Sequence, residues 1–189
     1  HCFSNMIAIG SKAGYSVNQT YGWNNVLIGN CAGYCSITGQ LNTYVGRDAG
    51  KCATGGTYNA YFGQSAGICA TGNSNTMIGA CAGRCFIAGA GNVFVGKYTA
   101  HEQKCGGNYN SYFGVRAGSS QCCGGGNIAI GSRALLPSAT GDRQLIIATC
   151  LYDSDTGKRC VNYIAGCQSS EGCTHVSIGT TDVDGVVGS

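Results

Sequence analysis

A short phrase recurs through most of the chain and constrains the fold more than any other feature. It consists of Asn, a variable residue, two mostly apolar residues and Gly, and its seven copies run from residues 25–29 to residues 127–131. Successive repeat glycines are 17, 17, 16, 17, 18 and 17 residues apart, and a looser copy at residues 5–10 precedes them. One β-prone phrase and two turns in each repeat are typical of a solenoid coil. We therefore expect an all-β fold, a parallel β-solenoid (β-roll) of about eight 17-residue coils.

Small side chains dominate the composition, and they suit a solenoid with a thin core. Of the 189 residues, 33 are Gly and 14 are Cys, whereas charged residues make up only 10%. So few large side chains cannot fill a thick core, which disfavours an ordinary α/β enzyme. Disorder would require a high net charge, and the formal net charge is only +3.

Stacked coils place equivalent residues in columns, and neighbouring strand residues face opposite sides of a sheet. The residue before each repeat glycine is large and β-prone, so we expect an inward core ladder of Ile28, Val45, Phe62, Ile78, Val95, Phe113 and Ile130. The preceding residue would then face outward, and its aromatic members are predicted to contact other copies of the chain: Tyr44, Tyr61, Phe94 and Tyr112. A solvent-facing aromatic stripe without a partner is the plainer alternative.

The asparagine of each phrase is predicted to bond backbone groups at a turn, stacked from coil to coil. This ladder would consist of Asn25, Asn42, Asn59, Asn75, Asn92, Asn110 and Asn127.

Pro137 marks a change in charge and in the repeat. Residues 1–136 carry 8 basic and 2 acidic residues, whereas residues 137–189 carry 3 basic and 6 acidic residues. The phrase also decays after residue 136. We expect residues 1–136 to form the β-solenoid repeat domain, and residues 137–189 to form a C-terminal β-rich segment that caps the exposed strand edge.

The phrase resembles the repeats of fibrous surface proteins. The copies at residues 5–10 and 127–131 are similar to the head repeats of YadA-like trimeric autotransporter adhesins, and the array resembles the shaft repeats of bacteriophage tail fibres, particularly of marine cyanobacterial phages. Residues 141–145 and 176–181 resemble the segment that often follows such repeats. The resemblance covers roughly residues 5–181 and implies a homotrimer of left-handed parallel coils that forms a stiff shaft.

A column of cysteines lies six residues after the repeat glycines: Cys35, Cys52, Cys69 and Cys85. Neighbouring rungs of a stack lie about 4.8 Å apart, within the roughly 4.4–6.8 Å Cα separation of a disulfide. The sequence leaves open a disulfide ladder, within or between chains, and a reduced column of small apolar side chains. No cofactor and no metal site are expected, because the zinc-like and calcium-like spacings lack their remaining ligands.

The chain offers little for catalysis, so we expect no enzyme activity. Asp48 and Glu102 are the only carboxylates before residue 137, whereas glycoside cleavage needs a carboxylate pair. Basic residues are too sparse for a nucleic-acid partner. The longest apolar stretches fall far below the ~20 residues of a membrane span.

These observations favour a structural fibre protein. We expect a stiff trimeric shaft of a viral tail fibre or surface filament, located on a virion surface or an extracellular or cell surface, that attaches to a host-surface glycan or receptor. A bacterial adhesin that binds glycan or matrix directly is the alternative. An ice-binding β-solenoid is more remote, because only Thr38, Thr54 and Thr71 stack where a regular threonine array is needed.

Overall fold

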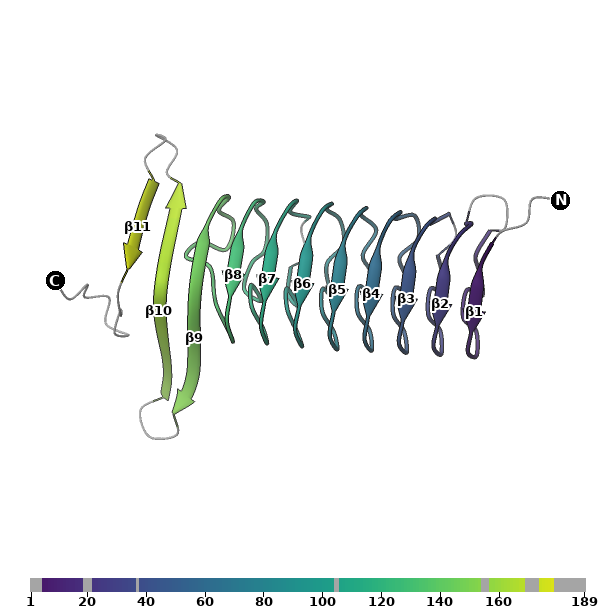
Figure 1. The fold of residues 1–189 in the computed structure, drawn as a ribbon, viewed down its shortest axis with the longest axis horizontal. Helices are drawn as coiled ribbons and strands as arrows, with labels where there is room; N and C mark the ends of the chain where they lie inside the picture. Colours follow the sequence, from purple (N-terminus) through teal and green to yellow (C-terminus); the bar gives the residue numbers. More distant parts are fainter. Residues whose placement is uncertain are drawn as a thin grey trace.

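The chain folds into a solenoid whose coils stack along one long axis (Figure 1). The computed structural model describes residues 5–18, 22–36, 38–103, 106–153, 157–168 and 174–178, and side chains up to residue 148. Eight three-residue strands recur once per coil: β1 (Ile7–Ile9), β2 (Val26–Ile28), β3 (Thr43–Val45), β4 (Ala60–Phe62), β5 (Thr76–Ile78), β6 (Val93–Val95), β7 (Ser111–Phe113) and β8 (Ile128–Ile130). The expected all-β parallel β-solenoid of about eight coils is confirmed.

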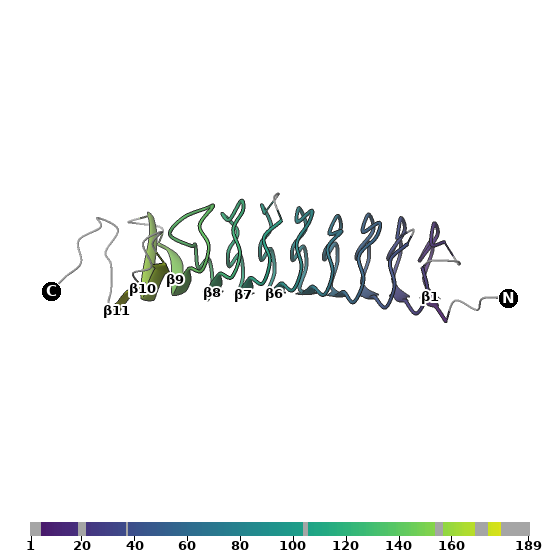
Figure 2. The same cartoon turned by 90° about the horizontal axis from the view of Figure 1, so that it is seen from above.

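All strands belong to one sheet that follows sequence order. From β1 to β9 (Leu145–Asp153) neighbouring strands are parallel and in register, so that Tyr44 pairs with Tyr61 and Val45 with Phe62. Figure 2 shows that the strands line one side of the shaft, while the turns of each coil lie on the other side. Every coil therefore presents one short strand to the same face of the molecule.

The middle residue of each strand from β2 to β8 is buried inside the coil, so the predicted orientation of these strands is wrong. The inward column consists of Leu27, Tyr44, Tyr61, Met77, Phe94, Tyr112 and Ala129, each 0% exposed. The predicted core ladder lies on the outer face of the sheet instead: Ile28, Val45, Phe62, Ile78, Val95, Phe113 and Ile130. The predicted inter-chain aromatic column is also wrong, because its four rings are fully buried within their own chain.

The asparagine ladder explains this orientation. Asn42 precedes Tyr44 by two residues, so strand alternation puts both side chains on one face. The side chain of Asn42 must lie inside, because its Oδ1 accepts the backbone N–H of Asn59 at 2.9 Å and its Nδ2 donates to the carbonyl of Gly56 at 2.8 Å. Whatever residue follows Asn by two positions is thereby turned into the core.

The Oδ1 bond to the next coil recurs along the whole array. It joins in sequence Asn25, Asn42, Asn59, Asn75, Asn92, Asn110 and Asn127, and Gln144 donates its backbone N–H to Asn127 in the last rung. The predicted ladder is thus present, and it satisfies buried backbone groups that would otherwise be unpaired at the turn.

Two glycine positions make room for this core. A Cβ on Gly50, whose φ is +55°, would lie 2.5 Å from Cε2 of Tyr44. A Cβ on Gly46, whose φ is +133°, would lie 2.5 Å from the carbonyl oxygen of Gly63 in the next coil. The recurring glycines therefore allow the coils to stack closely and the rings to lie flat against the backbone.

The stacked register continues past Pro137. The first residues of β9 pair in parallel with β8, with Leu145 opposite Ile128. β9 then pairs with the antiparallel strand β10 (Gly157–Gln168), which pairs in turn with β11 (Thr174–Ile178). The C-terminal segment thus extends the sheet beyond the last coil and covers the edge that β8 would otherwise expose.

Candidate functional site

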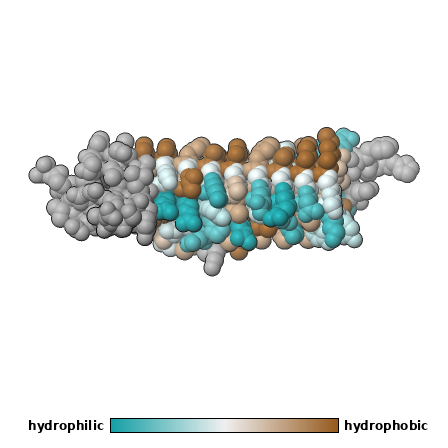
Figure 3. Space-filling view, turned by 90° about the horizontal axis from the view of Figure 1, so that it is seen from below, coloured by the Kyte–Doolittle hydropathy of each residue, from teal (hydrophilic) through white to brown (hydrophobic). Residues whose placement is uncertain are grey.

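The outer face of the sheet is uncharged and largely apolar, with Thr43, Thr76 and Ser111 as its polar members in β1–β8. Two residues of each strand point outward, and none of them in β1–β8 is charged. The column before the repeat glycines contains only Ile, Val and Phe, with Phe62 40%, Ile78 42% and Phe113 41% exposed. Figure 3 shows a largely brown band, with paler residues between, along one edge of the described shaft. Such large contiguous apolar patches mark interaction surfaces more often than free surface.

The cysteine column lies on the turns, away from this sheet. Its four members, Cys35, Cys52, Cys69 and Cys85, are free thiols, so of the two arrangements that the sequence left open the structure has the reduced column. The stacking itself is present, because the backbone N–H groups of Cys35 and Cys52 both donate at 2.7 Å to the neighbouring coil. Burial, and next the adjacent Cys69 thiol, raise the pKa of Cys52. Both factors favour the protonated thiol, which is the less nucleophilic form.

Neither a metal centre nor a membrane span emerges from the part of the chain that the structure describes. Within those ranges, no three His, Cys, Asp or Glu side chains come together as metal ligands. The same ranges hold no helix with the length and hydropathy needed to cross a bilayer.

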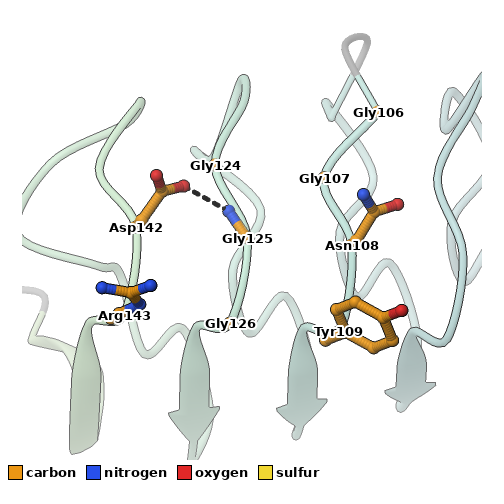
Figure 4. A pocket seen from close by; sticks show the side chains of 9 residues that line it. All are labelled: Gly106, Gly107, Asn108, Tyr109, Gly124, Gly125, Gly126, Asp142 and Arg143. Atoms are coloured by element: carbon orange, nitrogen blue, oxygen red, sulfur yellow. Dashed lines mark hydrogen bonds between the residues drawn. The ribbon is translucent and has the colours of Figure 1, made fainter.

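A glycine-lined pocket of about 440 Å³ opens between three late coils (Figure 4). Its floor is backbone from the glycines at 106–107 and 124–126, and its side chains include Asn108, Tyr109 and Asp142. The polar groups already bond within the fold: Asp142 Oδ1 accepts the Gly125 N–H at 2.6 Å, and Asn108 Oδ1 accepts the Ala90 N–H at 2.8 Å. The pocket therefore presents mainly backbone, the exposed ring of Tyr109 and the side chain of Arg143.

A second pocket, of about 360 Å³, is richer in charge. It is lined by Arg84, Tyr98, His101, Glu102, Arg116 and Ser119. Two cations lie close to the Tyr98 ring, with Arg116 Cζ 5.6 Å and Lys97 Nζ 5.2 Å from the ring centroid. The His101 ring meets the Tyr98 ring nearly edge-on, at 5.1 Å and 86°.

His101 contributes a neutral imidazole to this pocket. Its Nε2 is buried and has no hydrogen-bond partner among the described residues. Burial, followed by the positive charge of Arg84, lowers the pKa of His101, and Glu102 opposes this only in part. The imidazole is therefore neutral at neutral pH and retains one unused hydrogen-bonding atom.

The residues predicted from the sequence lie in the strand and turn columns described above. The second pocket was not predicted from the sequence. Arg84, His101 and Ser119 each lie five residues after a repeat glycine, whereas Tyr98 and Arg116 each lie two residues after one. The available signal was the departure of the Gly96 repeat from its neighbours, with Ala100 where Gly50 stands in an earlier coil.

This architecture defines a β-solenoid repeat protein. No known family model, curated protein or solved structure matches the chain.

Proposed function

We propose that the chain is a segment of a stiff homotrimeric shaft, belonging to a viral tail fibre or another extracellular filament that attaches to a host surface. The observation that carries this proposal is the apolar outer face of the sheet, which runs from β1 to β8 without a charged residue. The role is structural, and the turns, rather than the sheet, are left for attachment.

A second copy of the same chain is the partner that this face fits best. The outward Ile, Val and Phe side chains recur once per coil, so they lie about 4.8 Å apart along the shaft. Another copy carries the same spacing and can match it in register over the full length. A globular partner would match such a repeat only by coincidence. Three copies about one axis would bury the apolar faces of all three chains in closed symmetry. The resulting rod would be stiffer than a single solenoid chain.

Light scattering coupled to size-exclusion chromatography tests the proposal directly. The expected particle contains three chains. Phe113→Asp places a charge on the proposed interface, so it should yield monomers that keep the far-ultraviolet circular dichroism of the parent. Because Phe113 is 41% exposed in the single chain, the charge need not enter the coil's own core.

Gln64→Glu is the matched control. Gln64 is exposed and follows a repeat glycine. The carboxylate of the Gln64→Glu variant would therefore lie beside the apolar face and not on it. This variant should remain trimeric. A wild-type chain that is monomeric at every concentration would contradict the proposal, as would a Phe113→Asp variant that assembles like its parent.

A further inference from the structure

We propose that the pocket around Tyr98 binds an anionic saccharide, meaning a sugar that bears a carboxylate or sulfate group. The inference deepens the proposed attachment function, and it rests on that function for the choice of a saccharide. The anion preference follows from the arrangement of side chains alone.

An internal comparison between two coils shows how the pocket arises. In the coil that starts at Gly46, Asp48 lies between two cations: its carboxylate is 3.5 Å from Arg47 Nε and 3.0 Å from Lys51 Nζ. The coil that starts at Gly96 places Lys97, Tyr98 and His101 at the equivalent positions. A tyrosine thus replaces the carboxylate that neutralises this site in the earlier coil.

The backbone supports this comparison. Asp48 and Tyr98 both adopt left-handed geometry, with φ of 60° and 59°. Each also donates its N–H to a carbonyl of the preceding coil, at 2.9 Å for Asp48 and 3.0 Å for Tyr98. The two side chains therefore leave the backbone at equivalent positions of their coils. The two coils differ at this position in the charge of the side chain and not in its placement.

The cations around Tyr98 consequently lack an ion-pair partner in the described part of the chain, although the carboxylate of Glu102 also lines the pocket and acts on His101. Both ion pairs among the described residues involve Asp48, so no described carboxylate lies within 4.0 Å of Arg84, Lys97 or Arg116. The two arginines come from the coils before and after Tyr98, and both line the pocket around its ring. An arginine fork binds a carboxylate or sulfate through two parallel hydrogen bonds, which makes it well suited to such groups.

The remaining groups suit a sugar better than a bare ion. The hydroxyl of Ser119 and the unpartnered Nε2 of His101 can exchange hydrogen bonds with sugar hydroxyls. Three consecutive coils contribute to the pocket and span roughly 10 Å at the spacing of neighbouring strands. Its volume of about 360 Å³ lies within the range of small-ligand pockets. A single pyranose ring with its charged substituent fits these dimensions.

Isothermal titration with three defined oligosaccharides tests the site. The probes are an oligogalacturonate, which carries carboxylates, a heparin-derived oligosaccharide, which carries sulfates, and a neutral malto-oligosaccharide. At least one charged probe should bind, more weakly at high salt, and the stronger of the two identifies the anion. Equal binding of the neutral probe would overturn the proposal, as would failure of both charged probes to bind or equally tight binding of short single-stranded DNA.

Tyr98→Asp is the sharpest variant, because it rebuilds the neutralised arrangement of Asp48 at a backbone position that accepts aspartate. It should reduce affinity for the charged probe about tenfold or more, since a carboxylate then competes for the arginines. Arg116→Gln removes one exposed cation and should weaken binding to a similar degree. Arg47→Gln removes an exposed cation from the compensated coil, so it should bind like the parent.

These outcomes separate this site from the proposed shaft. A trimer that binds none of the charged probes would overturn the saccharide site and leave the shaft intact. A monomer that binds them would overturn the shaft and leave the site. Tyr98→Asp and Arg116→Gln variants that bind like the parent would overturn the site even where the wild-type chain binds.

Discussion

The rings of Tyr44 and Tyr61 stack inside the solenoid, with their centroids 4.7 Å apart and their planes 6° from parallel. Both side chains are fully buried, and their phenol oxygens have no hydrogen-bond partner among the described residues. The rings therefore stabilise the stack of coils itself, through burial and offset stacking, and take no part in contacts between chains.

Tyr61→Ser should destabilise the fold. Loss of a buried ring leaves a cavity between Tyr44 and Met77, and large-to-small changes of this kind lower the free energy of unfolding by about 3–5 kcal/mol. Urea denaturation followed by circular dichroism measures the loss. Tyr58→Ser is the control, because Tyr58 is 64% exposed and its removal should change stability by no more than about 0.5 kcal/mol. Equal effects of the two variants would contradict the assignment of Tyr61 to the core.

Stability should fall steeply in alkali. Burial raises the pKa of Tyr44, Tyr61 and Tyr112 above the ordinary value of 10.0. A raised pKa in the folded state means that stability is fully present below about pH 10 and declines above it, because only the unfolded chain then releases these protons. Circular dichroism across this pH range detects the decline. Tyr61→Phe removes one of the three groups and should make the decline shallower; an unchanged slope would argue against this cause.

Asn59→Ala should weaken the ladder at its centre. Asn59 Oδ1 accepts the Asn75 N–H at 2.9 Å, and Asn59 Nδ2 donates to the Gly72 carbonyl at 2.9 Å. Each group left buried and unpaired costs about 1–3 kcal/mol, so denaturation should reveal at least that loss. Asn30 is exposed and makes one long contact of 3.5 Å, so Asn30→Ala should be nearly neutral. A neutral Asn59→Ala would show that water replaces the ladder bonds.

Mild oxidation should join Cys52 to Cys69. The two thiols occupy consecutive coils, and Cys69 lies close enough to Cys52 to help raise its pKa. Exchange with oxidised glutathione would transfer its disulfide to the pair and release two molecules of reduced glutathione. Peptide mapping without reductant identifies the bond, and the reaction should speed up as pH rises because the thiolate attacks. Cys69→Ser should abolish this product; its persistence, or two unreacted thiols in the parent, would rule out the pairing.

The repeat made the solenoid predictable from the sequence, but not the orientation of its strands. Tyr44 and Val45 are neighbours, so alternation places them on opposite faces without saying which face is the core. Both columns are apolar, and hydrophobicity therefore could not decide between them. The position of Asn42, two residues before Tyr44, decides the orientation, because the buried hydrogen bonds of its side-chain amide can form only on the inner side.

The pocket around Tyr98 was hidden for a different reason. Arg84 and Arg116 are 32 residues apart in the sequence, and nothing in their spacing predicts that they line one pocket. They meet because consecutive coils stack and bring the second and fifth positions after each repeat glycine to the same turn. Reading the chain as columns of those two positions would have placed them together.

The sequence by itself determined the architecture. Its glycines and asparagines recur every 16 to 18 residues, and that spacing is compatible with stacked coils and little else. Only the tertiary structure decided which apolar column is buried and which is displayed, because that choice depends on where the asparagine amides find backbone partners. The same stacking decided which cations form an ion pair, since Asp48 reaches Arg47 and Lys51 of its own coil.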